Sequence, residues 1–225
     1  MPCAKGSPSF VTVMRFAGSP DSVLGTKNKK TNFVHTFIYM EGKMNKDILK
    51  VLIGEEEIEA IVSDIASRID RDYADLNGKL VLVAILKGSV VFMGDLMKKV
   101  TLPVEIDFMK VSSYGSGTKS TGNINIHLDL QRHDIDQCNI LIVEDIIDSG
   151  KTLSHLVHYL KLKGAKSVKT CTLLDKPSRR EVDFEADYVG CQIPDEFVVG
   201  YGLDFDEKYR ALPYIGILKP EAYAN

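Results

Sequence analysis

Three acidic residues and a Ser-Gly-Lys-Thr turn lie within one short segment, residues 142–152. Glu144 and Asp145 follow an apolar run directly, and Asp148 comes three residues after Asp145. The turn, residues 149–152, precedes a stretch with the apolar spacing of a helix. Adjacent acids at a strand end and a polar turn at a helix start suit different parts of one polar ligand.

The turn is suited to a phosphate group. Backbone N–H groups at the start of a helix point toward a bound anion, Gly150 permits close approach, and the hydroxyls of Ser149 and Thr152 add donors. Glu144 and Asp145 suit hydroxyl donors or a cation instead. A phosphate site beside a site for vicinal hydroxyls fits a ribose 5-phosphate that lies along the loop.

Two other phosphate-binding motifs do not fit. A Walker A motif needs a glycine five residues before Gly150, where this chain has Asp145, an acid that would repel a triphosphate. A dinucleotide fingerprint starting at Gly115 and Gly117 would need a third glycine where Ser120 stands, and no helical pattern follows.

The segment resembles the phosphoribosyl pyrophosphate motif of type I phosphoribosyltransferases, and its acid pair followed by Asp-Ser-Gly-Lys-Thr is similar to the hypoxanthine-guanine branch. The resemblance covers nearly all of residues 47–223. Three further matches occur in the family's order: Leu86-Lys87-Gly88, Leu174-Asp175-Lys176, and Ile193-Pro194-Asp195-Glu196-Phe197-Val198-Val199-Gly200-Tyr201-Gly202-Leu203-Asp204.

The resemblance implies a fold and a reaction. The fold is α/β, with a central, mostly parallel sheet flanked by helices and a small hood formed by the N- and C-terminal segments. The reaction joins hypoxanthine or guanine to the ribose of phosphoribosyl pyrophosphate and releases pyrophosphate. Dimers and tetramers are usual in this family, so a homodimer or homotetramer is expected.

The resemblance also assigns roles. Asp148 would take the proton from purine N7 as general base, and a magnesium ion would be held by Asp204 with Glu144 and Asp145, the acids that bind the ribose hydroxyls. The residues implied for the other substrate groups are Lys87, Gly88 and Arg210 for pyrophosphate; Ser149, Gly150, Lys151 and Thr152 for the 5′-phosphate; and Lys176, Phe197 and Val198 for the purine. A cis peptide bond is implied before Lys87.

The patterns around these motifs predict βα units. Residues 55–73 have apolar positions at helical spacing with acids at the front end, and residues 90–100 follow the Lys87-Gly88-Ser89 turn as a second helix. A third helix is expected to end at Lys163. Strands are predicted over residues 80–86, 103–111, 123–130, 139–143 and 168–174. A parallel sheet binds its ligand beyond the carboxyl ends of its strands, which is where the motifs lie.

Residues 112–122 are polar and rich in glycine and lie between two predicted strands. Such a stretch is expected to move, and a site that must exclude water needs a lid. Ser113 and Tyr114 are therefore predicted to close over the substrates during turnover.

Composition limits the class of protein. The chain has 225 residues, with 28 Lys and Arg against 31 Asp and Glu. Residues 1–43 hold six of the basic and two of the acidic residues, show no helical or strand period, and are expected to form an extension with little fixed structure ahead of a domain over 44–225. The remaining excess of acids argues against a nucleic-acid-binding surface.

The cysteines and the apolar runs indicate a cytosolic enzyme. The four cysteines form no CxxC pair, so neither a disulfide framework nor a zinc site is indicated. No apolar run approaches the length needed to cross a membrane. His155 and His158 have the spacing of metal ligands on a helix, but no acid or cysteine completes a set there.

Two alternatives remain open from the residues. A protein of this fold could bind RNA as a regulator with lost or reduced catalysis; Asp148 and the set of Lys176, Phe197 and Asp204 argue against it. An enzyme of this fold could also use another base, such as xanthine or a pyrimidine. Lys176 favours a 6-oxo group, but discrimination at purine C2 depends on backbone carbonyls.

Overall fold

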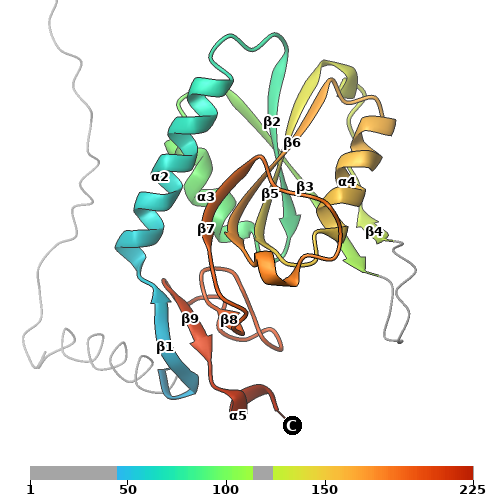
Figure 1. Cartoon of the computed structure of the whole chain (residues 1–225). Helices are drawn as coiled ribbons and strands as arrows, with labels where there is room; N and C mark the ends of the chain where they lie inside the picture. Colours follow the sequence, from blue (N-terminus) through green and yellow to red (C-terminus); the bar gives the residue numbers. More distant parts are fainter. Residues whose placement is uncertain (1–44, 114–123, 225) are drawn as a thin grey trace, which may run out of the picture. The chain divides into compact units, whose positions relative to one another are not determined.

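The larger of two sheets holds most of the chain in the computed structural model, which describes residues 45–113 and 124–224 (Figure 1). Its strand order is β4-β3-β2-β5-β6-β7, and all neighbouring pairs are parallel except β3 and β4. The strands are β2 (Lys79–Leu86), β3 (Val104–Ser113), β4 (Ile124–Leu128), β5 (Cys138–Ile147), β6 (Ser167–Asp175) and β7 (Tyr188–Gln192). The predicted, mostly parallel sheet is confirmed.

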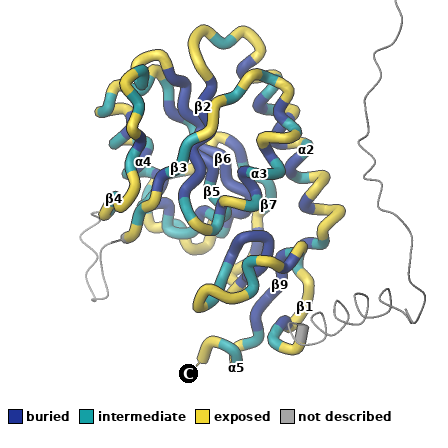
Figure 2. Tube along the Cα trace, turned by 180° about the vertical axis from the view of Figure 1, so that it is seen from behind, coloured by how far each residue is buried: buried dark blue, intermediate teal, exposed yellow. Residues whose placement is uncertain are grey.

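Three helices cover the two faces of this sheet. They are α2 (Glu55–Asp72), α3 (Val90–Lys99) and α4 (Lys151–Leu162). Leu80, Leu82 and Ala84 of β2 pack with α2 and α3, whereas Val81 and Val83 pack with α4. Successive side chains of a strand point to opposite faces, so a continuous apolar run such as β2 is buried on both sides, as the dark blue centre of Figure 2 shows.

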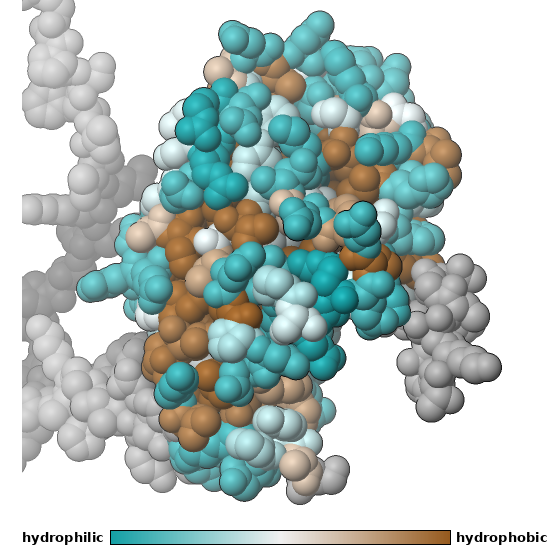
Figure 3. Space-filling model, in the orientation of Figure 1, coloured by the Kyte–Doolittle hydropathy of each residue, from teal (hydrophilic) through white to brown (hydrophobic). Residues whose placement is uncertain are grey.

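A second, three-stranded sheet forms the hood. Its order is β1-β9-β8, and both pairings are antiparallel. The elements are β1 (Ile48–Ile53), β8 (Val198–Val199) and β9 (Ile215–Leu218), followed by the short helix α5 (Pro220–Tyr223). Leu49 and Val51 of β1 point outward and are exposed, and Figure 3 shows hydrophobic surface over this region. The hood therefore joins the N- and C-terminal ends of the described domain, as predicted.

Most predicted elements agree with the structure, but several strand bounds were wrong. β5 continues four residues beyond the predicted end at Val143, so the acid pair lies inside the strand. β4 ends at Leu128 instead of Leu130, because its pairing with β3 ends where Leu128 meets Lys110. Three short 3-10 helices also occur among the described residues: η1 (Asn45–Asp47), η2 (Ile135–Gln137) and η3 (Pro177–Arg179). None of the described helices has the length and apolar character needed to span a lipid bilayer.

Several predictions lie outside the described residues. They concern the N-terminal extension over residues 1–43 and the lid residues that follow Ser113, including Tyr114. Ser113 itself is the last residue of β3.

Candidate active site

The predicted residues converge on one edge of the large sheet. β2, β5 and β6 are parallel neighbours, and the Lys87-Gly88 turn, the acid segment and Lys176 stand at or just after their carboxyl ends. The connections from β2 and β5 lead to opposite edges of the sheet, because β3 lies on one side of this pair and β6 on the other. Such a switch point is the usual ligand site of an open α/β sheet.

The start of α4 has the geometry of an anion site. Gly150 is the N-cap residue of α4 and, as a glycine, supplies no capping side chain. Its φ of +81 is a left-handed conformation that glycine tolerates. The Lys151 N–H lies 3.4 Å from Ser149 Oγ, a long hydrogen bond. The Lys151 ammonium forms an ion pair with Glu181. Thr152 stands in the first turn, so the predicted phosphate residues are gathered at one helix end.

Glu144 and Asp145 are poorly hydrated carboxylates within the last part of β5. Glu144 Oε2 is shielded from solvent and has no hydrogen-bond partner among the described residues. Burial, and then the charge of Asp145, raises the pKa of Glu144 well above its usual value. Burial also raises the pKa of Asp145 to about 6, although the Ile146 N–H donates to its carboxylate at 2.7 Å. Groups held in this way gain from a ligand that supplies hydroxyl donors or a cation.

Close backbone contacts bring the Lys87-Gly88 turn against the acid pair. The peptide bond between Leu86 and Lys87 is cis, as the family resemblance implied. A Cβ added at Gly88 would lie 1.6 Å from Asp145 Oδ2, and one added at Gly202, which has φ +101, would lie 2.1 Å from the Gly88 carbonyl oxygen. Gly88 is thus enclosed between a carboxylate and the backbone of the 200–210 segment, and no larger residue fits there.

The two basic side chains predicted to bind pyrophosphate, Lys87 and Arg210, both contact the carboxylate of Glu207. Lys87 Nζ donates to both carboxylate oxygens of Glu207, at 3.0 and 3.1 Å. Arg210 Nη2 lies 3.4 Å from Glu207 Oε2 and 2.8 Å from Asp204 Oδ1. The sequence interpretation had given no role to Glu207. In the sequence Glu207 is one of several acids close to Asp204 and Arg210, and nothing distinguishes it from the others. The structure therefore places Lys87, Asp204 and Arg210 in one charged network.

Magnesium fits this set only together with a substrate. No group of three His, Cys, Asp or Glu side chains within 45–113 and 124–224 is arranged to hold a metal by itself. The unpartnered Glu144 Oε2 offers one oxygen ligand, and Mg²⁺ commonly takes one or two carboxylates plus substrate phosphates and waters. The donor chemistry is therefore compatible with magnesium, while Glu144, Asp145 and Asp204 as its ligands stay a prediction.

The segment after β6 holds the acid loop in place through two arginines that the sequence interpretation missed. Arg180 donates to the Asp148 backbone carbonyl and forms an ion pair with the buried carboxylate of Asp175. Arg179 Nε lies 3.3 Å from Asp148 Oδ1. The available signal was the basic pair close behind the Leu174-Asp175-Lys176 motif. Asp148 is partly exposed, so its carboxylate can reach a ligand at this edge.

The predicted purine residues lie next to this clamp. Lys176 Nζ donates to the backbone carbonyl of Glu196 at 2.7 Å, which ties the end of β6 to the segment that carries Phe197 and Val198. The Phe197 side chain is 37% exposed, whereas Val198 is buried and pairs with Ile217 in the hood. A base beside Lys176 could therefore meet an aromatic surface.

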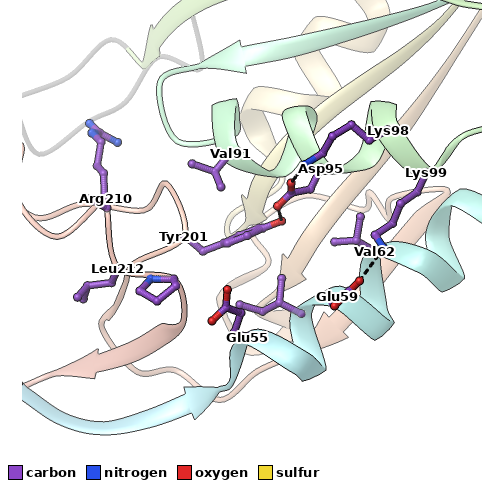
Figure 4. Close-up of a pocket in the computed structure, with 13 residues that line it drawn as sticks. Glu55, Glu59, Val62, Val91, Asp95, Lys98, Lys99, Tyr201, Arg210 and Leu212 are labelled. Atoms are coloured by element: carbon purple, nitrogen blue, oxygen red, sulfur yellow. Dashed lines mark hydrogen bonds and ion pairs between the residues drawn. The ribbon is translucent and has the colours of Figure 1, made fainter. Parts of the chain in front are cut away.

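A separate cavity of about 510 Å³ lies between α2, α3 and the segment after Tyr201 (Figure 4). Of the predicted site residues only Arg210 lines it. Its other charges are largely paired: Asp95 accepts from Lys98 and from the Tyr201 hydroxyl, and Lys99 pairs with Glu59. This cavity is therefore distinct from the edge where the acid pair, Asp148 and Lys176 meet.

The chain is also similar to known proteins over most of its length. A family model described as phosphoribosyl transferase domain matches residues 53–206. A bifunctional protein TilS/HprT of Listeria monocytogenes is 52% identical over 182 residues, which are 81% of this chain and 28% of that protein. The chain thus spans only about 28% of that relative's length.

Two further matches extend over nearly the whole of the related chain. The hypoxanthine-guanine phosphoribosyltransferase of Bacillus subtilis is 51% identical over 81% of this chain and 99% of its own. A crystal structure of a hypoxanthine phosphoribosyltransferase from Staphylococcus aureus superposes with a TM-score of 0.76 at 49% identity, covering 81% of this chain and 97% of that one. With the site geometry and the matched domain, these likenesses show that the chain belongs to the phosphoribosyltransferase family, in its hypoxanthine-guanine branch.

Proposed function

We propose that this chain transfers the 5-phosphoribosyl group from phosphoribosyl pyrophosphate to hypoxanthine or guanine, giving IMP or GMP and pyrophosphate. One observation carries the proposal: the strand edge brings the phosphate turn, the acid pair and Asp148 together with Lys176. A ribose phosphate at the turn and a 6-oxopurine at Lys176 would meet beside Asp148. The half-identical relatives named for this activity support the same assignment.

Different residues of the chain bind different parts of the ligand. The amides at the start of α4 bind the 5′-phosphate and fix one end of the donor. Glu144 and Asp145 accept hydrogen bonds from the ribose hydroxyls, and their negative charge favours the positive charge that develops on the sugar as pyrophosphate departs. Asp148 accepts the N7 proton of the incoming purine, which makes the attacking nitrogen N9 the better nucleophile.

The leaving group is held at the other end of the site. Lys87 and Arg210 bind the pyrophosphate oxygens in place of the Glu207 carboxylate that they contact in the free protein. Magnesium, when bound with the substrate, neutralises charge on the pyrophosphate. Glu144, Asp145 and Asp204 would hold it.

Assay of one set of bases tests this proposal directly. The protein is incubated with magnesium, phosphoribosyl pyrophosphate and, separately, hypoxanthine, guanine, xanthine, adenine and uracil, and nucleotide formation is followed. Product is expected with hypoxanthine and guanine. Failure with both would overturn the proposal, product with xanthine would broaden the substrate class, and product with uracil alone would favour the pyrimidine alternative.

Binding to RNA tests the regulatory alternative in parallel. A regulator without catalysis would bind RNA with an affinity that falls steeply with salt, because phosphate contacts release counterions. The expected result for an enzyme is nucleotide formation without such binding.

A further inference from the structure

Phe197 is the centre of an aromatic cluster at the end of the chain. The ring of Tyr223 stacks on Phe197 with centroids 4.8 Å apart and an interplanar angle of 21°. The ring of Phe205 meets Phe197 edge-on, at 5.6 Å and 88°. Phe197 is nevertheless 37% exposed. Because Tyr223 covers one ring face and Phe205 meets the ring edge-on, the exposed part belongs mainly to the other face.

The segment that carries Phe197 makes different contacts on its core side and on its hood side. On the core side, Lys176 Nζ donates to the carbonyl of Glu196, the residue before Phe197. On the hood side, the Leu218 N–H donates to the Phe197 carbonyl at 2.8 Å, and α5 with Tyr223 follows directly. Figure 1 shows α5 at the end of the hood that points away from the large sheet. Lys176 thus contacts the residue next to Phe197, whereas Tyr223 belongs to α5 in the hood, so the face of Phe197 that Tyr223 leaves open is the one available to a base held beside Lys176.

We propose that Tyr223 is a positioning residue for the purine, the outer layer of a three-layer stack whose middle layer is Phe197 and whose inner layer is the bound base. This inference rests on the proposed function, because the base is placed by Lys176 and Asp148. Tyr223 does not touch the base. It acts by holding the Phe197 ring parallel to the plane in which the base must lie.

The short helix that carries Tyr223 is fixed to the domain at its start. The Lys219 N–H donates to the Asp47 carbonyl at 2.9 Å, the Lys219 side chain donates to the Lys46 carbonyl, and Ala222 packs against the small core of the hood. Tyr223 is thus anchored where it stacks on the partly exposed ring of Phe197. An ordered ring binds a base better, since less side-chain freedom is lost on binding.

Substitution of Tyr223 in the full chain tests the proposal. Tyr223→Ala and Tyr223→Leu both remove the stack, and Leu keeps most of the apolar volume in case the Ala variant folds poorly. We expect both to raise the KM for hypoxanthine and guanine roughly 3- to 10-fold, the scale of an aromatic pair. The KM for phosphoribosyl pyrophosphate and the kcat should each change less than twofold. The melting temperature should change by less than about 3 °C. Tyr223→Phe should restore the purine KM.

Glu221→Ala is the matched control, because it lies on the same helix outside the aromatic cluster. An unchanged purine KM in both Tyr223 variants would overturn the proposal, and so would a lowered KM, which would mean that Tyr223 covers the face needed by the base. Equal changes for both substrates would indicate a general structural role and would also contradict it. An unsubstituted chain that forms no nucleotide would refute the proposed function instead, so the two failures are distinguishable.

Discussion

Asp148 combines accessibility with a fixed backbone. Its carboxylate is partly exposed and near Arg179, while Arg180 binds its carbonyl oxygen. Asp148→Asn keeps the shape but cannot accept the N7 proton, so kcat should fall roughly 10²- to 10⁴-fold. Steady-state kinetics should show KM values for both substrates within about threefold, since the surface pair with Arg179 contributes little. Near-normal turnover would rule out the role of general base.

Gly88 has no space for a side chain, and this gives a second prediction. A methyl group there would lie 1.6 Å from the Asp145 carboxylate, so Gly88→Ala must displace the turn or the acid. A displacement of about 1 Å at a reacting centre can cost roughly 10²-fold. We expect kcat/KM for phosphoribosyl pyrophosphate to fall on that scale.

Gly94 supplies the matched control for Gly88. It lies inside α3, and an added Cβ would have nothing within 4 Å. Gly94→Ala should leave kcat/KM unchanged and raise the free energy of unfolding by roughly 0.5–1 kcal/mol, because alanine favours helix. Equal losses of activity in both variants would show that the contact with Asp145 is not the cause.

At the scale of elements, the connection after β6 locks the loop that follows β5. Lys176 N–H donates to the Ile147 carbonyl and Glu181 N–H to the Ser149 carbonyl, each at 3.0 Å. Arg180 completes the lock through the Asp175 carboxylate, which is only 9% exposed. The loop that is predicted to bind phosphate and ribose is therefore tied by hydrogen bonds and an ion pair to the end of β6 and the segment after it.

Arg180→Met tests the lock. It leaves the Asp175 carboxylate buried without its cation, so the free energy of unfolding should fall by about 3–5 kcal/mol in a denaturant titration. Arg179→Met removes only two exposed ion pairs, with Asp148 and Asp195, and should change stability by less than about 1 kcal/mol. Similar losses in the two variants would contradict the assignment of the lock to Arg180.

At the scale of the whole molecule, the described residues supply three hydrophobic clusters. All three hydrophobic clusters are built from residues between Ile48 and Ala222. The alignment with the Bacillus subtilis relative also covers nearly all of that enzyme with 81% of this chain. The domain from residue 44 onward is therefore expected to fold by itself.

A chain that begins at Met44 tests this expectation. Its unfolding free energy should lie within about 0.5 kcal/mol of the full chain, since the three clusters of the described residues stay complete. Its kcat/KM for hypoxanthine should lie within about twofold. A large loss of either quantity would show that the first 43 residues belong to the domain or its site.

The sequence by itself predicted three helices, five of the six strands of the large sheet and a ribose phosphate site at the acid segment. α2 and β2 could be predicted because apolar spacing reports burial directly. The acid pair, Asp148 and the Ser-Gly-Lys-Thr turn are contiguous, so their spacing fixes their neighbourhood before the chain folds. Lys176 and Phe197 were found by resemblance, since a single lysine or phenylalanine has no local signal of function.

Only the tertiary structure decided the contacts that join distant parts of the chain. The pairing of β1 with β9 unites residues 162 or more positions apart, and no local pattern encodes such a pairing. The contact of Lys87 with Glu207, the clamp by Arg180 and the stack of Tyr223 on Phe197 have the same origin. Spacing along the chain governs neighbours within a helix, strand or turn, whereas these contacts depend on how the sheet and hood pack. The segment over residues 142–152 thus predicts the chemistry, and the tertiary structure supplies the residues that hold this segment in place.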